Sequence, residues 1–417
     1  MLKVKPSIKT CYVAMLAMIL MVTGCSPVNP PDPDPIVTFR LGSEVFLDQY
    51  LHLVAGKRVG LVTNQTGVTK TGESLIPIFY QHPDINLTAL YAPEHGLDGT
   101  ASAGAYVESY THPEYGIPVY SLYGATRKPT TAMLDKVDIL VFDIQDIGAR
   151  TYTYMSTMNY CMVAAQRDDI PIIILDRPNP LGGLIVEGAV LEDRFITFVG
   201  VDNLPMAHGM TAGELARFFN RKIGASLIVI PMEGYTRDMI FQDTGLPFKQ
   251  TSPNIPNLQS AFGYMATGLG EGTRVGQQDK FTWIGGTGIN SQEFADRLNA
   301  AGLKGITYHP DTRGSWGGVR LEITDYHTFN PARAGMYALA IAKQLKSDFV
   351  IPKSTSTTIV MFDKVMGTDK IGQYLEMNLE PGEIISRYQP DLDRFKQERI
   401  AYLIYDLTPR KIPLILQ

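Results

Sequence analysis

Short apolar runs that each end in a polar turn are the feature of this chain that most restricts its fold. Five such runs lie at 58–63, 86–91, 117–122, 139–142 and 171–175, and a further strand is expected at 226–231. Segments with apolar residues at helical spacing separate several of them, at 73–81, 130–136 and 156–167. Strands that alternate with helices form a largely parallel sheet covered on both faces. We therefore predict an α/β fold in which the polar turns collect along one edge of the sheet.

The second half of the chain is less regular. Turns rich in proline and asparagine interrupt the alternation at 251–257. Beyond them, helices are expected at 291–301, 331–346 and 381–399, and strand pieces at 318–324, 326–329 and 357–362. Because the periods are mixed, we predict a smaller α+β domain in this half. The 417 residues are thus divided into a larger N-terminal domain at 39–258 and a C-terminal domain at 259–417.

The N-terminus has the features of an export signal. Three lysines precede an apolar segment at 12–22, which is too short to span a bilayer but has the length of a signal-peptide core. Small residues then precede Cys25, as in a bacterial lipobox. We expect a lipoprotein signal peptide at 1–24, lipidation of Cys25 and a Pro-rich tether at 25–38. The alternative is an ordinary signal peptide in which Cys25 is incidental.

Charge and cysteine content narrow the possible partners. The formal net charge is −5, and cleavage after Gly24 would remove three lysines and no acid. A nucleic-acid partner requires a basic face, so we expect none. After cleavage, Cys161 would be the only cysteine other than the lipidated Cys25, so no disulfide framework is expected. The protein is expected in the cell envelope, held to a membrane by lipid and facing the periplasm.

Glu94 is the first candidate for chemistry. It follows the run at 86–91 and lies between Pro93 and His95, in a turn that Gly96 completes. A carboxyl group in such a place acts as a general acid if burial or another carboxylate raises its pKa. The alternative is a solvated loop glutamate. His95 either contacts a ligand or holds the turn by hydrogen bonding.

The turn after the run at 139–142 carries the largest group of candidates. It contains carboxylates, an amide, an arginine and two tyrosines, namely Asp143, Gln145, Asp146, Arg150, Tyr152 and Tyr154. Sugars bind to such mixtures through ring stacking and charge-assisted hydrogen bonds. The alternative is that Arg150 pairs with one of the two acids and fixes the loop, while the tyrosines make ordinary interface packing.

Further polar residues follow other runs. The additional candidates for substrate binding are Asn64, Asp176, Arg177, Asn179 and His208. Two prolines make the turn at 176–180 rigid, and its polar residues are either structural or ligand-binding. Glu187 and Glu271 each lie beside a glycine, and either could supply a second carboxylate.

No metal or cofactor is expected. His208 lacks a second histidine at helical spacing, and the chain has no cysteine cluster. The glycine-rich stretch at 268–272 lacks the Lys-Ser/Thr ending of a phosphate loop. A Gly-x-Ser-x-Gly pattern is also absent from the sequence, which argues against an α/β-hydrolase with a serine nucleophile.

Blocks of sequence along nearly the whole mature chain resemble the NamZ family of exo-β-N-acetylmuramidases. They lie at 92–96, 119–124, 142–150 with 152–154, 175–180, 186–188, 198–200, 208–211, 252–254 and 271–273. The resemblance implies a Rossmann-like N-terminal domain and a smaller C-terminal domain that closes over it. It also implies removal of terminal N-acetylmuramic acid from the non-reducing end of peptidoglycan fragments, with Glu94 as the catalytic acid. Asn254, in one of the matching blocks, joins the candidate substrate-binding residues.

One stretch departs from the family pattern. After 271–273 the family usually continues with Gly-Arg-Gly-Thr, whereas this chain reads Arg-Val-Gly-Gln-Gln-Asp-Lys-Phe at 274–281. If the usual arginine contacts substrate, then Arg274 or Lys280 takes its place, or the substrate preference differs.

Two hypotheses of different classes follow. The first is a lipid-anchored glycosidase of cell-wall turnover and recycling, in which Glu94 is the acid and a second carboxylate is the nucleophile or activates water. The candidates for that second carboxylate are Asp143, Asp146, Glu187 and Glu271. The lactyl carboxylate of N-acetylmuramic acid should face a cation, for which Arg150 is the first choice and Arg177 the second.

The second hypothesis is a non-catalytic lipoprotein that captures muropeptides between two lobes. It predicts the same cleft and the same arginine. It does not require a pair of carboxylates that flank one glycosidic bond. The two hypotheses therefore differ in whether the protein cleaves a muraminide.

Overall fold

The computed structural model describes residues 38–346 and 348–406. The predicted signal peptide, Cys25 and nearly all of the predicted tether lie outside this range, as does the end of the C-terminal domain from residue 407. Within it, no helix combines the length and the hydropathy needed to cross a bilayer.

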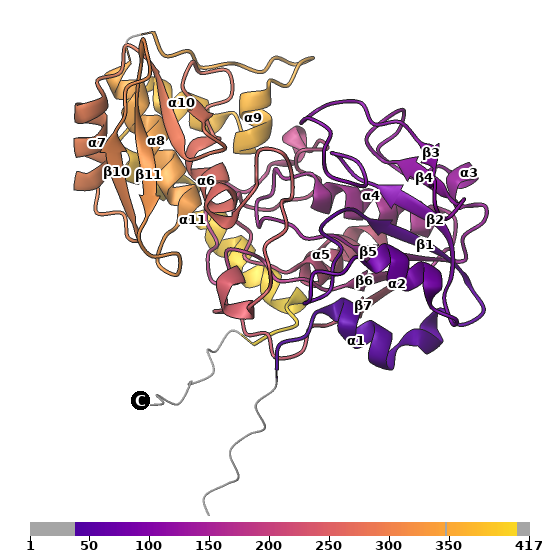
Figure 1. The fold of residues 1–417 in the computed structure, drawn as a ribbon. Coiled ribbons are helices and arrows are strands. Elements are labelled where there is room, and N and C mark those ends of the chain that lie inside the picture. Colours follow the sequence, from indigo (N-terminus) through magenta and orange to yellow (C-terminus); the bar gives the residue numbers. More distant parts are fainter. Residues whose placement is uncertain (1–37, 347, 407–417) are drawn as a thin grey trace, which may run out of the picture. The chain divides into compact units, whose positions relative to one another are not determined.

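The N-terminal half is built on a mixed but mostly parallel sheet (Figure 1). Its strands are β1 (Arg58–Thr63), β2 (Asn86–Ala92), β3 (Tyr110–Thr111), β4 (Pro118–Ser121), β5 (Ile139–Asp143), β6 (Ile172–Leu175) and β7 (Leu227–Ile230). They lie in the order β3-β4-β2-β1-β5-β6-β7. All neighbours are parallel except β3, which runs antiparallel to β4. The predicted α/β fold is confirmed.

Burial on both faces explains the uninterrupted apolar run of β5. Leu140 and Phe142 pack into the core on the side of α4 (Tyr154–Arg167) and α5 (Ala212–Ile223). Ile139 and Val141 point the other way, into a second cluster with α1 (Gly42–Gln49) and α2 (Leu75–Gln81). Successive side chains of a strand face opposite sides, so a strand between two helical layers needs apolar residues at every position.

The C-terminal half contains a separate antiparallel sheet with the order β10-β11-β9-β8. Its strands are β8 (Gly276–Gln278), β9 (Trp283–Thr287), β10 (Ile306–Pro310) and β11 (Trp316–Ile323). The helices of this half are α6 (Leu258–Thr267), α7 (Ser291–Ala300), α8 (Pro331–Leu345), α9 (Met361–Met366), α10 (Lys370–Glu376) and α11 (Pro381–Glu398). The predicted α+β character is confirmed.

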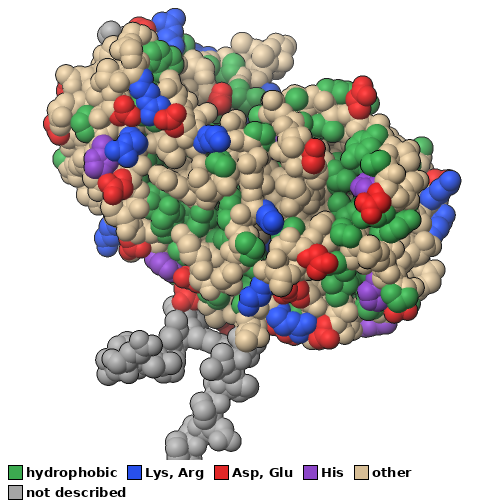
Figure 2. Space-filling view, viewed as in Figure 1, with side chains coloured by type: hydrophobic (Ala, Val, Ile, Leu, Met, Phe, Trp, Pro, Cys, Tyr) green, Lys and Arg blue, Asp and Glu red, His purple; other side chains and the backbone are tan. Residues whose placement is uncertain are grey.

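The short elements complete the described chain. They are α3 (Thr131–Leu134) and the 3₁₀ turns η1 (Leu51–Leu53), η2 (Asp193–Phe195), η3 (Phe241–Thr244) and η4 (Arg399–Tyr402). On the face drawn in Figure 2, acidic and basic side chains are interspersed, so this face carries no continuous patch of one charge.

Two of the strand pieces predicted for the C-terminal half are wrong. At 326–329 the chain forms a turn, because the Asp325 carboxylate accepts hydrogen bonds from the His327 N–H (3.0 Å) and the Thr328 hydroxyl (2.8 Å). The stretch at 357–362 is irregular and then enters α9. Strand β9 was not predicted, because its two central glycines obscure the strand pattern. A Cβ at Gly285 would lie 2.3 Å from the Gly317 carbonyl oxygen, so the close approach of β9 and β11 requires glycine there.

The strand order places a topological switch point between β1 and β5. From β1 the chain proceeds to β2 and β4 on one side, and it returns to β5 and β6 on the other. Crossover helices diverge at such a point and leave a crevice at the carboxyl ends of the two strands. The residues that follow β1 and β5 therefore occupy the position where open α/β sheets bind ligands.

Candidate active site

Asn64 and Gln145 meet at the switch point, where Thr66 joins them. The Asn64 side-chain oxygen accepts hydrogen bonds from the Thr66 N–H (2.9 Å) and hydroxyl (2.6 Å). The backbone N–H of Gln145 donates to the Thr66 hydroxyl at 2.9 Å. All three residues are buried. The Asn64 Nδ2 and the Gln145 Oε1 nevertheless have no hydrogen-bond partner among the described residues, so each retains the capacity for a hydrogen bond.

Asp146 and His208 extend this group. The Asp146 Oδ2 accepts a hydrogen bond from the Gly148 N–H at 2.8 Å and lies 3.7 Å from the His208 Nε2. The His208 Nδ1 accepts from the Met210 N–H at 3.2 Å, so a neutral His208 carries its proton on Nε2. Both residues are buried, and neither the Asp146 Oδ1 nor the His208 Nε2 has a partner within the described part of the chain. The carboxylate and the imidazole therefore offer an acceptor and a donor at one place.

Glu94 lies just beyond β2 with its carboxylate buried and held at both oxygens. Oε1 accepts from the Gly104 N–H at 2.8 Å, and Oε2 accepts from the Thr153 hydroxyl at 2.5 Å. The residue is 8% exposed, which excludes the alternative of a solvated loop glutamate. These two donors fix the position of the carboxyl group. His95 has a left-handed backbone (φ 71°), and its Nδ1 contacts the Ala101 carbonyl oxygen at 2.8 Å, so it holds this turn.

Tyr264 on α6 is a site residue that the sequence reasoning missed. Its hydroxyl lies 3.1 Å from that of Thr151, and its ring packs edge-on against Tyr152, with centroids 5.9 Å apart. Burial raises the pKa of the Tyr264 phenol to about 12, and the negative charges of Glu94, Glu271 and Asp146 act in the same direction. The phenol thus stays protonated at neutral pH. No local motif marks it, because a lone tyrosine in an apolar helix has the pattern of a core residue.

The divergent stretch at 274–281 contains β8 and a strained turn that leads into β9. Asp279, Lys280 and Phe281 all have positive φ, at 50°, 55° and 69°. Left-handed backbone costs a non-glycine residue roughly 1–2 kcal/mol. The turn brings the Phe281 ring to a centroid distance of 5.0 Å from Tyr264. A Cβ at Gly263 would lie 2.1 Å from the Phe281 carbonyl oxygen, so this turn is packed directly on α6.

Within the described residues, neither Arg274 nor Lys280 forms a hydrogen bond or an ion pair with Glu94. Arg274 is exposed and pairs with Asp348 at 3.1 Å. Lys280 is exposed as well. Glu271 is also exposed, but its negative charge helps to raise the pKa of Tyr264. Because Arg274 is exposed and already paired with Asp348, its surroundings do not favour the expected contact with substrate.

Asp143 is paired internally, with Arg177 and not with Arg150. The Arg177 Nε and Nη2 each donate to one Asp143 oxygen at 2.7 Å, and Nη2 also donates to the Val68 carbonyl oxygen at 2.7 Å. Both side chains are almost fully buried. The carboxylate is thereby occupied on both oxygens, which argues against a catalytic role for Asp143 and against Arg177 as a ligand for the lactyl group.

Arg150 corrects a central expectation of the sequence analysis. Its Nη1 donates to the carbonyl oxygens of Ala189 (2.9 Å) and Leu204 (2.8 Å), and its Nη2 donates to that of Val365 (2.5 Å). Burial without a carboxylate partner lowers the pKa of Arg150 to about 9. The guanidinium is enclosed by backbone carbonyls of both halves of the chain. It neither braces Asp143 or Asp146 nor is open to a substrate carboxylate.

Replacement of Arg150 by alanine is expected to lower stability without changing substrate preference. Each buried carbonyl left without its donor costs about 1–3 kcal/mol. Thermal unfolding together with rates on a muraminide and a glucosaminide checks this expectation. A selective loss on the muraminide, with the melting temperature unchanged, would restore Arg150 as the lactyl-binding residue.

Glu187 connects the two halves and is not placed for catalysis. Its Oε2 accepts from the Arg333 Nε at 2.9 Å and lies 3.3 Å from the Asn330 Nδ2, while its Oε1 accepts from the Tyr388 hydroxyl at 3.1 Å. Its side chain is only 3% exposed. A carboxylate with this many donors is a structural anchor.

Asp176 and Asn179 are also structural. Asp176 caps α5 by accepting from the Gly213 N–H at 2.7 Å, and it accepts from the Tyr405 hydroxyl at 2.7 Å. The Asn179 Nδ2 donates to the Met210 carbonyl oxygen at 3.1 Å, and its Oδ1 accepts from the Leu181 N–H at 3.0 Å. The rigid turn at 176–180 thus fixes neighbouring backbone through hydrogen bonds.

Tyr152 and Tyr154 hold the segment at 251–255. The Tyr152 hydroxyl donates to the Thr251 Oγ1 at 2.9 Å, and the Tyr154 hydroxyl donates to the Thr251 carbonyl oxygen. Tyr154 is fully buried, so its ring cannot stack on a sugar. Asn254 is exposed in the turn that Thr251 anchors.

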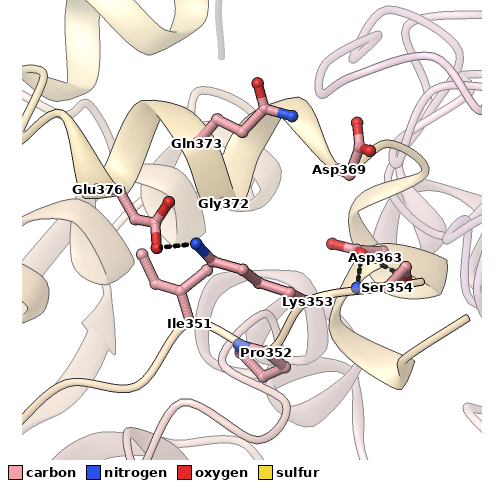
Figure 3. A pocket seen from close by; sticks show the side chains of 9 residues that line it. All are labelled: Ile351, Pro352, Lys353, Ser354, Asp363, Asp369, Gly372, Gln373 and Glu376. Atoms are coloured by element: carbon pink, nitrogen blue, oxygen red, sulfur yellow. Dashed lines mark hydrogen bonds and ion pairs between the residues drawn. The ribbon is translucent and has the colours of Figure 1, made fainter.

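A separate pocket of about 220 Å³ lies in the C-terminal half (Figure 3). Its polar wall includes Lys353, which pairs with Glu376 at 2.7 Å, and Asp363, which accepts from the Ser354 hydroxyl at 2.5 Å. None of the residues predicted for catalysis or substrate binding lines it. The polar group at the carboxyl ends of the strands, and not this pocket, is therefore the candidate active site.

The chemistry that this group can perform follows from its composition. Glu94 and Asp146 are buried carboxylates that both act on the Tyr264 phenol. Asn64, Gln145 and His208 carry unpartnered polar atoms, and His208 lies 3.7 Å from Asp146. Two carboxylates together with neutral donors and acceptors are the equipment for general acid–base chemistry on a polar, uncharged bond such as a glycosidic link.

Comparison with known proteins identifies relatives with the same architecture. A curated Bacillus subtilis (strain 168) protein, peptidoglycan beta-N-acetylmuramidase NamZ, is 43% identical over 88% of this chain and 91% of its own length. The crystal structure of a DUF1343 family protein from Bacteroides fragilis has a TM-score of 0.79 and 35% identity, over 89% of this chain and all of that one. A second DUF1343 structure from that organism has a TM-score of 0.66 and 27% identity, over 88% of this chain and 99% of its own.

Family models match both halves. The N-terminal model of exo-beta-N-acetylmuramidase NamZ matches residues 59–259, and its C-terminal model matches 262–405. These matches cover the strands, the acids at their ends and the helix that carries Tyr264. The chain therefore belongs to the exo-beta-N-acetylmuramidase NamZ family.

Proposed function

We propose that this protein is an exo-acting glycosidase that releases terminal β-linked N-acetylmuramic acid from the non-reducing end of peptidoglycan fragments during cell-wall turnover. The observation that carries the proposal is the buried pair of acids, Glu94 and Asp146, at the carboxyl edge of the sheet, beside unpartnered polar atoms. Membership of the NamZ family and 43% identity to a peptidoglycan beta-N-acetylmuramidase support the same substrate class.

Glu94 is assigned as the general acid. Its proton passes to the glycosidic oxygen as the bond from that oxygen to C1 of the muramic acid breaks. Addition of water to C1 then returns one proton to a carboxylate, so the enzyme is regenerated. The hydroxyl of Thr153 can either donate to or accept from the carboxyl group, which allows Glu94 to keep this contact in both protonation states.

Asp146 is our choice for the second carboxylate. Among the four candidates, Asp143 and Glu187 are occupied by arginines. Asp146 has one oxygen held by the Gly148 N–H and the other without a partner, as a nucleophile or base requires. Glu271 remains the alternative because it is exposed near Tyr264.

The decisive test is turnover of a chromogenic β-N-acetylmuraminide by the purified mature protein. We expect release of the chromophore from the muraminide and little from the β-N-acetylglucosaminide. Tight binding of N-acetylmuramic acid without any release would favour the alternative, a non-catalytic two-lobed lipoprotein that binds muropeptides.

We further propose that Cys25 is acylated and tethers the protein to a membrane, with the folded part facing the periplasm. The small residues before Cys25 and the proline-rich stretch behind it support this. A Cys25→Ser variant is expected to keep its signal peptide and to carry no lipid, as mass spectrometry of the N-terminus would reveal. A wild-type protein with an unmodified N-terminal cysteine would refute the anchor.

A further inference from the structure

The proposed substrate carries a lactyl carboxylate, yet both arginines predicted to bind it are unavailable. Arg150 is enclosed by three backbone carbonyls, and Arg177 is paired with Asp143. A cation for the lactyl group must therefore come from elsewhere at the same edge of the sheet. The following inference rests on the proposed function, because it concerns the substrate of that site.

Arg127 is a guanidinium framed by two aromatic rings. Its Cζ lies 4.5 Å from the ring centroid of Tyr123 and 5.1 Å from that of Phe198. These rings contact each other at 5.9 Å, and Tyr160 on α4 supports Phe198 at 5.2 Å. Cation–π contacts hold the plane of a guanidinium while its N–H edge stays free for a bidentate bond to a carboxylate.

The charge of Arg127 has no acidic partner among the described residues, and its side chain is exposed. Other arginines that lie over aromatic rings, Arg194, Arg221 and Arg313, are each paired with an aspartate. Arg387 lies over Tyr374 with its Cζ 5.6 Å from the ring centroid, and no ion pair involves it within the described range. It is on α11, in the C-terminal half of the chain.

Strand pairing places Tyr123, over whose ring Arg127 lies, at the same edge of the sheet as Glu94. Strands β4 and β2 are parallel neighbours with Ser121 opposite Ala92, so Tyr123 and Glu94 each lie two residues beyond that pair. Neighbouring strands are roughly 4.8 Å apart. The Val107 N–H donates to the Tyr123 carbonyl oxygen at 3.1 Å.

Two connections of limited length support this placement. Gly104, which donates to Glu94, is three residues from Val107, and three residues span at most roughly 11 Å. Along α4, the rise from Thr153, which also donates to Glu94, to Tyr160 is roughly 10 Å. These limits tie the acid and the guanidinium, as separate groups, to one edge of the sheet.

This separation suits the chemistry of muramic acid. The glycosidic oxygen is on C1, and the three-carbon lactyl ether is on C3, so the two protein groups that serve them must not be in contact. The carboxylates of Asp146 and Glu271, whose charges both act on Tyr264, would repel a lactyl carboxylate on their side of the sugar ring. We propose that Arg127 binds the lactyl carboxylate of the terminal N-acetylmuramic acid, and that Tyr123 and Phe198 hold its guanidinium in position.

The test compares Arg127→Met with the matched control Arg387→Met, in which a second exposed arginine over an aromatic ring loses its charge. The substrates are a chromogenic muraminide with a free lactyl carboxylate and the same compound with that group converted to a neutral methylamide. We expect Arg127→Met to lower kcat/KM on the free acid by about 10- to 100-fold and to leave the amide nearly unaffected. Arg387→Met is expected to change neither rate.

Equal losses on both substrates, or no loss on the acid, would overturn the assignment of Arg127. Calorimetric binding of N-acetylmuramic acid to the wild type and to Arg127→Met gives a readout that does not depend on turnover. If the wild type binds the acid through Arg127 and cleaves neither substrate, then the catalytic proposal fails and the Arg127 assignment stands. Unchanged binding in Arg127→Met would overturn the assignment whether or not the protein is an enzyme.

Discussion

A Glu94→Gln variant is expected to turn over an unactivated muramic disaccharide roughly 10²- to 10⁴-fold more slowly than the wild type. The amide fills the same space, and its oxygen can still accept from the Gly104 N–H or the Thr153 hydroxyl. It cannot give a proton to the leaving glycosidic oxygen. The initial rate of sugar release, together with the melting temperature, measures the effect.

Glu108→Gln is the matched control for this variant. Glu108 is an exposed glutamate that follows the same turn, and its loss should leave the rate unchanged. Substrate binding should persist in Glu94→Gln, since only the proton is lost. If Glu94→Gln turned over the disaccharide at the wild-type rate, Glu94 would not be the acid. If its melting temperature were lowered, the loss of activity would be assigned to folding.

Loss of Arg177 is expected to destabilise the protein strongly. Arg177→Met leaves the buried Asp143 carboxylate without both of its donors, and breaking a buried pair from one side costs about 3–5 kcal/mol. Replacing both partners by apolar residues of similar size should recover much of that loss, because no uncompensated charge then remains. Denaturant unfolding of the single and double variants measures both effects.

The ion pair of Arg58 with Asp138 provides the control. It joins the starts of β1 and β5, whereas Arg177 and Asp143 pair at the opposite end, and its side chains are 43% and 40% exposed. Exposed pairs contribute about 0–1 kcal/mol, so Arg58→Met should change stability little. If Arg177→Met and Arg58→Met proved equally mild, the buried pair would not be the anchor inferred here.

The general position of the site could be predicted from the sequence. Parallel strands align their carboxyl ends, so Asn64, Gln145 and Asp146 had to converge once β1 and β5 were neighbours. The apolar runs alone sufficed to predict the α/β fold, because buried strands leave few alternatives. The antiparallel sheet was harder to predict, since β9 owes its place to glycines that allow close backbone contact.

The ion-pair partners could not be read from sequence spacing. Arg150 lies seven residues after Asp143 in the chain, yet the backbone passes Gly148 and carries it to the Ala189 and Leu204 carbonyls. Arg177 reaches Asp143 because β6 lies beside β5 in register. Tyr264 likewise comes from a distant helix. Such contacts depend on tertiary packing, which local pattern does not encode.

Division of the site between the two halves constrains how this family can diverge. Glu94 and Asp146 follow strands β2 and β5 of the parallel sheet, whereas Tyr264 and Glu271 come from the C-terminal half. The contact of Glu187 with Arg333 and that of Arg150 with Val365 hold these contributions together. A substitution at these contacts would impair catalysis without touching substrate, so the two halves must accumulate changes in concert. Exchange of one half with that of a distant homologue should accordingly fail unless these contacts are exchanged with it.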